Sequence, residues 1–494
     1  MSNINYFHNL NTILKHEAFP YQKEAFNEIK DLPYSAIFHE QGLGKTKIAI
    51  DLMLYWLKEK NIDCVFVVTK KQLVNNWYNE FKEHTHIIPK VLSSDKKDNF
   101  YVLNSTIRII ITNFETISSE KERIKLFLKT RNVAIVIDES TKIKNPDSKL
   151  SKDFFDISPL FKIKTIMTGT PVANRPYDIW SQIYFLDQGK SLGDDFNVFK
   201  NRTNLTNDLN IKESKREEFE YSVASIFDKI KNFTVRETKN SGIISLPRKK
   251  YYYIYANFEK CQKDMYMKIK DDLSILIQKN NEAILDENEE TLKRLLRLVQ
   301  VASNPRLVDD FYGYNSGKEI CLDHLINEII SRNEKVIIWS SFIENIDYFY
   351  EKYKKYNPVK IHGKMTLDLR NKSVSSFKND HTCKILFATP QSAKEGLTLT
   401  VANNVIFYDR GFNLDDYLQA QDRIHRISQK KECNIYNILM KDSVDIWIDK
   451  LLIAKQNAAF LAQGDYKLSQ YEKKADYSFG DMIKQILNIN KEDY

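Results

Sequence analysis

The chain is poor in residues that break regular structure or cross-link it. Its 494 residues include only 13 glycines and 11 prolines, and its five cysteines form no C-x-x-C pair. This cysteine usage argues against a zinc site or a disulfide framework and indicates a reducing compartment. No apolar run approaches the length that spans a bilayer, and no apolar segment follows Met1, so we expect a soluble intracellular protein.

A strong excess of one charge is also missing. Lys plus Arg number 74 against 66 for Asp plus Glu, which gives a formal net charge of +8. Such a small excess suits a polyanionic partner without requiring one. Hydrophobic residues make up 42% of the chain, enough to fill the cores of about two to four domains. A globular enzyme is therefore permitted.

The strongest chemical signal is residues 39–46, His-Glu-Gln-Gly-Leu-Gly-Lys-Thr. They follow the short apolar run of residues 35–38 and open a segment with helical periodicity. This order of strand, glycine-rich turn and helix is the context of a phosphate-binding loop. His39 stands where the general pattern has glycine, and the alternative is an ordinary strand-to-helix turn.

Each residue type in the loop suits a triphosphate. Backbone N–H groups of the turn, which contains Gly42 and Gly44, would bind phosphate oxygens together with the helix N-terminus. Lys45 would place its ammonium against the β- and γ-phosphates, and the Thr46 hydroxyl would ligate Mg²⁺. Upstream, the Gln22 amide could read the edge of adenine, although a surface position is the simpler interpretation of an isolated Gln.

Apolar, β-branched runs follow the loop at residues 64–68, 109–111, 133–137 and 165–167. Runs of this kind predict strands buried on both faces of a parallel sheet, with the chemistry at their C-terminal ends. Asp138 and Glu139 follow the third run. Asp138 would hold Mg²⁺ and Glu139 would polarise the attacking water, whereas the alternative is an acidic turn or helix N-terminus.

The strand and helix pattern stops and then restarts. Residues 190–235 are polar and helical, residues 236–252 are predicted to be a basic connector, and residues 256–304 are helical again. Further strands are predicted at residues 336–339, 359–361, 385–388, 405–408 and 434–439. This second α/β half has no Gly-Lys-Thr of its own, which suggests one nucleotide bound between two halves.

Residues 419–429 carry the last signal, Gln-Ala-Gln-Asp-Arg-Ile-His-Arg-Ile-Ser-Gln. On a helix, Gln419, Arg423 and Arg426 would fall on one face, at i, i+4 and i+7. Guanidinium groups there could stabilise charge that develops on the γ-phosphoryl group. The alternative is an exposed helix face laced with salt bridges.

In this order, the three signals resemble the Swi/Snf-type branch of the superfamily-two helicase-like ATPases, from about Phe19 to about residue 460. Further segments that resemble motifs of this branch are residues 167–171, 303–307, 316–318, 335–340 and 396–400. Thr141 departs from the branch, which usually has His there. Ala393 and Lys394 replace two glycines, which is closer to the fork-remodelling and strand-annealing members.

The resemblance implies an α/β fold with two RecA-like parallel-sheet domains in tandem, helical protrusions at about 190–235 and 256–304, and a C-terminal brace helix at 441–460. The expected domains are residues 1–245, which bind ATP, residues 246–460, which form the helicase C-terminal half, and a helical tail at 461–494. It also implies an ATP hydrolase that uses Mg²⁺ and tracks along DNA, duplex more readily than single-stranded. Catalysis would involve Lys45, Glu139, Gln419, Arg423 and Arg426.

Contacts to DNA would be mainly phosphate contacts and therefore independent of sequence. The candidates at loop ends are Lys70, Asn113, Lys142, His362, Lys364 and Thr389. Three alternatives stay open: a strand-separating DNA or RNA helicase, a nucleotide-switched nucleic-acid-binding protein with little turnover, and a P-loop kinase. The compact chain suits the cytoplasm of a prokaryote or of a virus-infected host better than a eukaryotic nucleus.

Overall fold

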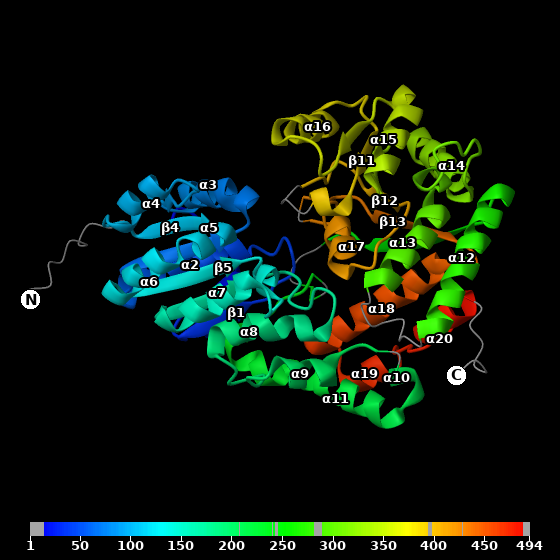
Figure 1. Cartoon of the computed structure of the whole chain (residues 1–494). Coiled ribbons are helices and arrows are strands. Elements are labelled where there is room, and N and C mark those ends of the chain that lie inside the picture. Colours follow the sequence, from blue (N-terminus) through cyan, green and yellow to red (C-terminus); the bar gives the residue numbers. More distant parts are fainter. Residues whose placement is uncertain are drawn as a thin grey trace, which may run out of the picture. The chain divides into compact units, whose positions relative to one another are not determined.

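The computed structural model describes residues 14–206, 208–239, 241–242, 246–280, 289–393, 398–426 and 428–487. The chain forms two compact units, each with one parallel sheet and flanking helices (Figure 1). Unit 1 comprises Met1–Asn204, Ser222–Ile244 and Ala462–Asp465, and unit 2 comprises Leu205–Tyr221, Ser245–Leu461 and Tyr466–Tyr494. Two parallel sheets in tandem confirm the predicted fold class.

In the described part of unit 1, seven strands form a sheet in the order β3-β4-β2-β5-β6-β1-β7, and every neighbouring pair is parallel. The strands are β1 (Tyr34–Ile37), β2 (Cys64–Thr69), β3 (Lys90–Val91), β4 (Ile109–Asn113), β5 (Val133–Asp138), β6 (Ile163–Met167) and β7 (Thr234–Val235). The five longer strands coincide with the predicted apolar runs. The two-residue strands β3 and β7 are too short to leave such a signal.

Helices cover both faces of this sheet. The helices of this unit before α9 are α1 (Pro20–Ile29), α2 (Lys45–Glu59), α3 (Val74–His84), α4 (Lys96–Leu103), α5 (Phe114–Ser119), α6 (Lys121–Thr130), α7 (Lys149–Ile157) and α8 (Trp180–Asp187). Helix α9 (Phe196–Thr203) packs beside α8 instead. Alternate side chains of β2 face opposite layers, as in any strand buried on both sides. Val65 and Val67 join the core that includes α1, α2 and α3, whereas the Phe66 ring lies 5.7 Å from Phe127 of α6.

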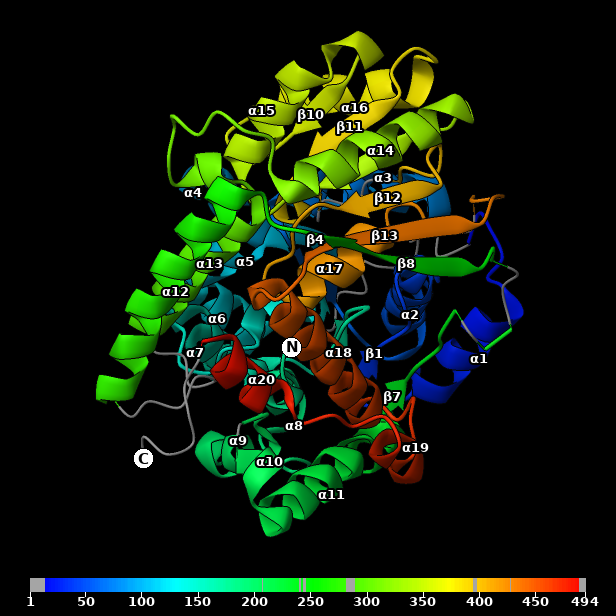
Figure 2. The ribbon, with the colours of Figure 1, turned by 90° about the vertical axis from the view of Figure 1, so that its right-hand side faces the viewer.

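In the described part of unit 2, six parallel strands follow the order β10-β11-β9-β12-β13-β8. They are β8 (Lys249–Ala256), β9 (Val336–Trp339), β10 (Val359–Ile361), β11 (Ile385–Ala388), β12 (Asn404–Phe407) and β13 (Cys433–Met440). Figure 2 shows β8 at the edge of the sheet, beyond β13. The predicted connector at 236–252 is therefore wrong at its end, because residues from Lys249 onwards form a strand.

The remaining helices confirm both predicted helical stretches and the helix near residues 441–460. They are α10 (Asp208–Ile211), α11 (Glu213–Ile230), α12 (Lys260–Asn280), α13 (Glu289–Ser303), α14 (Gly317–Ser331), α15 (Ile343–Lys352), α16 (Leu367–Asn379), α17 (Leu414–Gln421), α18 (Val444–Ala462), α19 (Leu468–Glu472) and α20 (Phe479–Ile486). Gly396, which belongs to one of the matching segments, and Lys394, which replaces a glycine of the family, lie outside the described residues.

Buried polar groups join the segments of unit 2. The Asp409 carboxylate accepts hydrogen bonds from the hydroxyls of Ser303 (2.9 Å) and Ser340 (2.5 Å) and from the Asn345 amide (3.2 Å). These donors come from the end of α13, the end of β9 and α15. Because each donor and the carboxylate are buried, the network fixes the carboxyl end of β12 against its neighbours.

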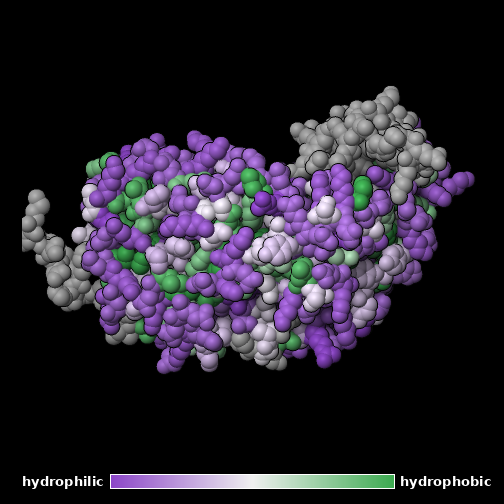
Figure 3. All heavy atoms as spheres, turned by 90° about the horizontal axis from the view of Figure 1, so that it is seen from below, coloured by the Kyte–Doolittle hydropathy of each residue, from purple (hydrophilic) through white to green (hydrophobic). Residues whose placement is uncertain are grey.

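One face of the molecule is drawn by hydropathy in Figure 3. On the face drawn in Figure 3, hydrophobic residues form small groups separated by hydrophilic ones. Among the described helices, none is long and apolar enough to cross a membrane.

Candidate active site

The register of the first sheet brings the predicted site residues to one edge. Ile37 pairs with Met167, and Met167 pairs with Asp138, so β1, β6 and β5 end at the same level. The next strand, β2, ends at Thr69, whose hydroxyl donates to Asp138 Oδ2 (3.2 Å). The phosphate loop after β1 and the acidic pair after β5 are therefore separated by a single strand.

The loop has the predicted geometry. Gly42 (φ 88°) and Gly44 (φ 69°) both adopt left-handed backbone, which glycine accommodates without strain. Helix α2 begins at Lys45, directly after Gly44. The Lys45 ammonium donates to the carbonyls of His39 (3.0 Å) and Glu40 (3.3 Å), so it lies across the loop. This is the strand, turn and helix arrangement that binds phosphate through backbone N–H groups.

Gln22 lies against the loop, as the adenine hypothesis requires. It is only 4% exposed, and its amide nitrogen donates to the Leu43 carbonyl (3.4 Å) while its oxygen accepts from the Phe19 N–H (2.9 Å). A Cβ on Gly44 would come within 2.1 Å of the Gln22 amide nitrogen. The glycine thus serves both the turn and the close approach of this side chain.

Asp138 is held by hydrogen bonds to one of its two oxygens. The Trp77 indole N–H and the Thr69 hydroxyl both donate to Oδ2, at 2.8 and 3.2 Å. Burial raises the pKa of Asp138 to about 6, and the neighbouring Glu139 charge acts in the same direction. A desolvated carboxylate with a second acid beside it is the environment that a divalent cation relieves.

Glu139 has a strained backbone at the same edge. Its φ of 56° and ψ of 52° lie in the left-handed region, which is uncommon for a residue with a side chain. Its Oε2 is buried and has no hydrogen-bond partner among the described residues. Strain and an unsatisfied buried oxygen together are typical of a residue kept for function rather than for packing.

The segment after β6 packs onto the loop. A Cβ on Gly169 would lie 2.7 Å from Gln41 Cγ, 3.0 Å from its backbone nitrogen and 3.4 Å from Lys45 Nζ. No larger residue fits here without displacing the loop. Gly169 is therefore part of the same constellation as Lys45.

Two residues that position the site were missed by the sequence analysis. Trp77 of α3 holds Asp138, and Gln182 of α8 accepts from the Ser140 hydroxyl (2.7 Å) while donating to the Pro171 carbonyl (2.7 Å). Gln182 thus joins the segments that follow β5 and β6. Its signal was a Gln within the apolar run of α8, where it is fully buried. Trp77 left no comparable signal.

These residues fit a Mg²⁺–nucleoside triphosphate. The helix N-terminus and Lys45 suit phosphate oxygens, and the Thr46 hydroxyl at the start of α2 with Asp138 at the end of β5 suit the cation. The Asp138 hydrogen bonds both fall on Oδ2, which leaves Oδ1 to face a cation or its water shell. The unsatisfied Glu139 Oε2 suits a water molecule.

The predicted helical face of Gln419, Arg423 and Arg426 is wrong. Helix α17 ends at Gln421, and residues 422–424 form a turn in which Leu399 N–H donates to the Arg423 carbonyl (2.9 Å). This contact diverts the backbone from the helix. Arg423 is 2% exposed and donates through Nε to the Gln419 carbonyl (3.1 Å).

Arg426 follows the turn at residues 422–424. It donates to the Asp422 carbonyl (3.0 Å) and the Thr398 hydroxyl (2.8 Å), and burial lowers the pKa of its guanidinium. Gln429 fixes the turn, because its amide donates to the carbonyls of Thr400 (3.3 Å), Ala402 (2.9 Å) and Ile424 (3.1 Å). Of the described residues in the run that resembles the family motif, those after Gln421 are therefore not helical.

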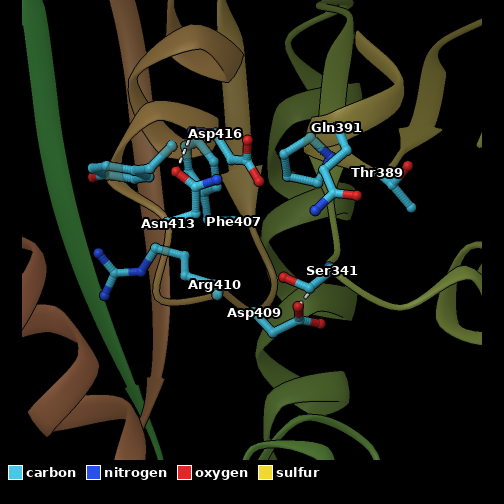
Figure 4. A pocket seen from close by; sticks show the side chains of 11 residues that line it. Ser341, Thr389, Gln391, Phe407, Asp409, Arg410, Asn413 and Asp416 are labelled. Atoms are coloured by element: carbon cyan, nitrogen blue, oxygen red, sulfur yellow. Dashed lines mark hydrogen bonds between the residues drawn. The ribbon is translucent and has the colours of Figure 1, made fainter. Parts of the chain in front are cut away.

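A small cavity of about 50 Å³ lies at the carboxyl edge of the second sheet (Figure 4). Its walls come from the turns after β9, β11 and β12 and from the start of α17. Two of its lining residues are joined directly, because Ser341 donates through its backbone N–H to Asp409 (2.6 Å). The cavity admits water molecules and is too small for a nucleotide.

The candidate DNA contacts fall into three groups by burial. Asn113, His362 and Thr389 are buried and engaged within the protein, since Asn113 caps α5 and Thr389 donates to the Ser392 hydroxyl (2.9 Å). Lys142 and Lys364 are exposed at 43% and 70% of their side chains. Lys70 is half-buried at the end of β2.

The fold and the site define a class, that of α/β proteins with a phosphate loop and an acidic strand end in the first of two parallel-sheet units. Within it, the chain belongs to the SNF2-related domain family, which matches residues 33–307. The helicase conserved C-terminal domain matches residues 318–428. Both matches confirm the Swi/Snf-type resemblance and the expected class of helicase-like ATPase.

Curated relatives share about a quarter of their aligned residues with the chain. The human SWI/SNF-related matrix-associated actin-dependent regulator of chromatin subfamily A member 1 is 28% identical over 430 residues, which cover 82% of this chain and 39% of that protein. The chromatin-remodeling complex ATPase ISW1 of Saccharomyces cerevisiae is 26% identical, covering 92% and 42%. An uncharacterized ATP-dependent helicase of Mycoplasma pneumoniae is 27% identical, covering 88% and 41%.

The chain therefore spans about two fifths of the length of these relatives. Among solved structures, the Sulfolobus solfataricus SWI2/SNF2 ATPase core in complex with dsDNA is similar with a TM-score of 0.42. It is 24% identical, and the match covers 94% of this chain and 98% of that one.

Proposed function

We propose that the protein is an ATP-dependent DNA translocase that hydrolyses ATP with Mg²⁺ and is stimulated by duplex DNA. The observation that carries this proposal is the convergence of the loop at Lys45, Gly169 and the Asp138–Glu139 pair on one edge of the first sheet. The names of the relatives, ATP-dependent helicases and remodelling ATPases, support hydrolysis coupled to nucleic acid.

Each site residue of the first unit has a distinct role in binding or hydrolysis. Backbone N–H groups at the start of α2 bind the phosphates, and Lys45 leaves the loop carbonyls for the β- and γ-phosphates. Thr46 and Asp138 hold Mg²⁺, which supplies neutralisation of phosphate charge when bound. Glu139 orients a water molecule and takes its proton during attack on the γ-phosphorus. Gln22 contacts adenine.

Two arginines of the second unit stabilise the transition state. Arg423 and Arg426 act on the charge that develops at the γ-phosphate, and Gln419 supports Arg423 through its carbonyl. The helicase conserved C-terminal domain matches residues 318–428, which include both arginines, and this supports their role. Arg426→Ala should therefore bind ATP and hydrolyse it slowly.

DNA is contacted through phosphates, without sequence preference. Of the six candidates, the exposed Lys142 and Lys364 and the half-buried Lys70 suit this role best, because their ammonium groups can reach a ligand at little desolvation cost. Translocation follows if ATP and ADP favour different arrangements of the two units, since a ligand shifts an equilibrium only by its differential affinity.

The decisive measurement is the rate of phosphate release without nucleic acid and with single-stranded DNA, duplex DNA or RNA. Duplex DNA should give the highest rate. Lys45→Ala should lower the stimulated rate at least about a hundredfold, as loss of a transition-state donor does. Lys58→Ala, on the exposed face of the same helix, is the control and should retain the rate.

The alternatives give other results. Nucleotide binding without turnover would favour a nucleotide-switched binding protein. Unwinding of a tailed duplex in a displacement assay would favour a strand-separating helicase, because a translocase of the proposed kind displaces only a third strand. Stimulation by RNA alone would overturn the choice of DNA.

A further inference from the structure

The phosphate loop is flanked by the segment that contains β7. Beyond the β1–β7 pairing, Phe38 N–H donates to the Val235 carbonyl and Glu40 N–H donates to the Glu237 carbonyl, both at 2.9 Å. The first residues of the loop are thus paired as if the strand continued. Their backbone conformation depends on residues 234–237.

Arg236 connects this segment to the entrance of the loop. One terminal nitrogen of its guanidinium donates to the Phe38 carbonyl (2.8 Å), directly before the loop. The Nε donates to Asp465 Oδ1 (2.7 Å), and the other terminal nitrogen pairs with Oδ2. The side chains of Arg236 and Asp465 are only 6% and 17% exposed. A forked, charge-assisted pair in such surroundings fixes position as well as charge.

Asp465, which lies beside Arg236, comes 229 residues later in the chain. After α18 the chain returns to unit 1 for Ala462–Asp465. Gly464 has a φ of +76°, and a Cβ there would lie 2.6 Å from the Phe227 ring of α11. The turn is therefore closely fitted to unit 1 and places the Asp465 carboxylate beside Arg236.

We propose that Arg236 and Asp465 are positioning residues for nucleotide binding, through which the segment after α18 sets the affinity of the phosphate loop. Neither residue is among the proposed nucleotide or catalytic residues. It holds the Phe38 carbonyl, and with it the start of the loop whose carbonyls at His39 and Glu40 bind the Lys45 ammonium. A partner or conformational change that withdraws Ala462–Asp465 would release nucleotide. This inference rests on the proposed nucleotide site.

The test compares the full-length chain with Asp465→Asn, which keeps the shape of the side chain and removes its charge. Affinity for a fluorescent ADP with Mg²⁺, the KM for ATP, kcat, and the thermal midpoint without nucleotide are measured together. We expect affinity to fall roughly tenfold and KM to rise equally, with a smaller change in kcat. Asp228→Asn, which disrupts the exposed Asp228–Lys231 pair, is the matched control and should change neither the affinity for ADP nor the KM for ATP.

Two further variants make the outcome independent of folding. Arg236→Lys keeps the charge and loses the fork, so it should weaken nucleotide binding in the same direction. The exchange Arg236→Asp with Asp465→Arg should recover part of the affinity. A lowered thermal midpoint with unchanged nucleotide affinity in Asp465→Asn and Arg236→Lys would show a purely structural pair and overturn the inference. Failure of the unaltered chain to bind any nucleotide would instead refute the proposed function.

Discussion

At the scale of single residues, Glu139 combines a left-handed backbone with a buried oxygen that no described residue binds. Such a conformation costs about 1–3 kcal/mol and persists only where the surroundings impose it. Glu139→Gln keeps the shape and removes the proton acceptor. We expect nucleotide affinity to stay the same and kcat to fall by roughly 10² to 10³. Single-turnover hydrolysis and equilibrium binding measure the two quantities separately.

Glu122 provides the comparison for this substitution, since 79% of its side chain is exposed. Glu122→Gln should hydrolyse ATP at the original rate. An unchanged rate in Glu139→Gln would mean that another group activates the water.

His39 predicts a pH dependence of stability. Burial, the largest cause, lowers the pKa of His39 to about 4, and the charges of Lys45 and Arg236 act in the same direction. The unfolded chain, with a His pKa of about 6.5, therefore binds the proton more readily than the folded chain. The contribution of the neutral ring is complete above about pH 6.5 and is lost as the pH falls towards 4.

His39→Gln removes this titration. Between pH 7 and pH 5, the wild-type chain should lose about 2 kcal/mol more of its unfolding free energy than the variant. Urea unfolding of the full-length chains, followed by tryptophan fluorescence at both pH values, measures the difference. Equal losses in the two proteins would show that the imidazole is protonated in the folded state as readily as in the unfolded state.

At the scale of elements, Lys318 joins the start of α14 to the start of α18. Its ammonium lies 2.5 Å from Asp445 Oδ2, and the two side chains are 0% and 4% exposed. Asp445→Asn leaves the buried ammonium without its counter-charge, which should destabilise unit 2 by about 3–5 kcal/mol. Thermal unfolding measures the loss. Lys318→Met combined with Asp445→Asn should recover part of it, because no charge is then buried alone.

The exposed pair of Lys250 and Glu432 serves as the control for this prediction. Both side chains are about half exposed, so Glu432→Gln should change stability by no more than about 0.5 kcal/mol. A loss as large in Glu432→Gln as in Asp445→Asn would show that burial is not what makes the inner pair matter.

Elements with continuous apolar runs could be predicted from the sequence, and elements shaped by distant contacts could not. β2 and β5 are buried on both faces and therefore carry unbroken β-branched runs. β8 has four exposed or half-exposed tyrosines next to basic residues, so its sequence resembles a connector. The end of α17 depends on Leu399 and Gln429, contacts that no local pattern records.

The residues of the candidate site also divide into those that the sequence predicts and those that it does not. Lys45, Thr46, Asp138 and Glu139 follow strand ends in a recognisable order, so their meeting at one sheet edge could be predicted. Trp77 and Gln182 act on the site from α3 and α8 across long stretches of chain, and only the fold brings them there.

At the scale of the whole molecule, DNA stimulation should depend steeply on salt. Phosphate contacts release condensed counterions, and on duplex DNA each contact changes the logarithm of affinity by about 0.9 per decade of salt. The concentration of DNA that gives half-maximal ATP hydrolysis should rise accordingly between 50 and 200 mM salt. The rate without DNA should change little. If this DNA concentration does not change with salt, DNA is not bound mainly through phosphate contacts.

The second sheet also has a consequence for synthesis on the ribosome. β8 pairs with β13, and the register joins Lys249 to Cys433, about 180 residues later in the chain. At about 5–20 residues per second, β8 therefore waits roughly 10–40 seconds for its neighbour to emerge. During this interval its tyrosines and unpaired backbone are open to other nascent chains. A chaperone that binds extended aromatic segments would have a binding site here until β13 emerges.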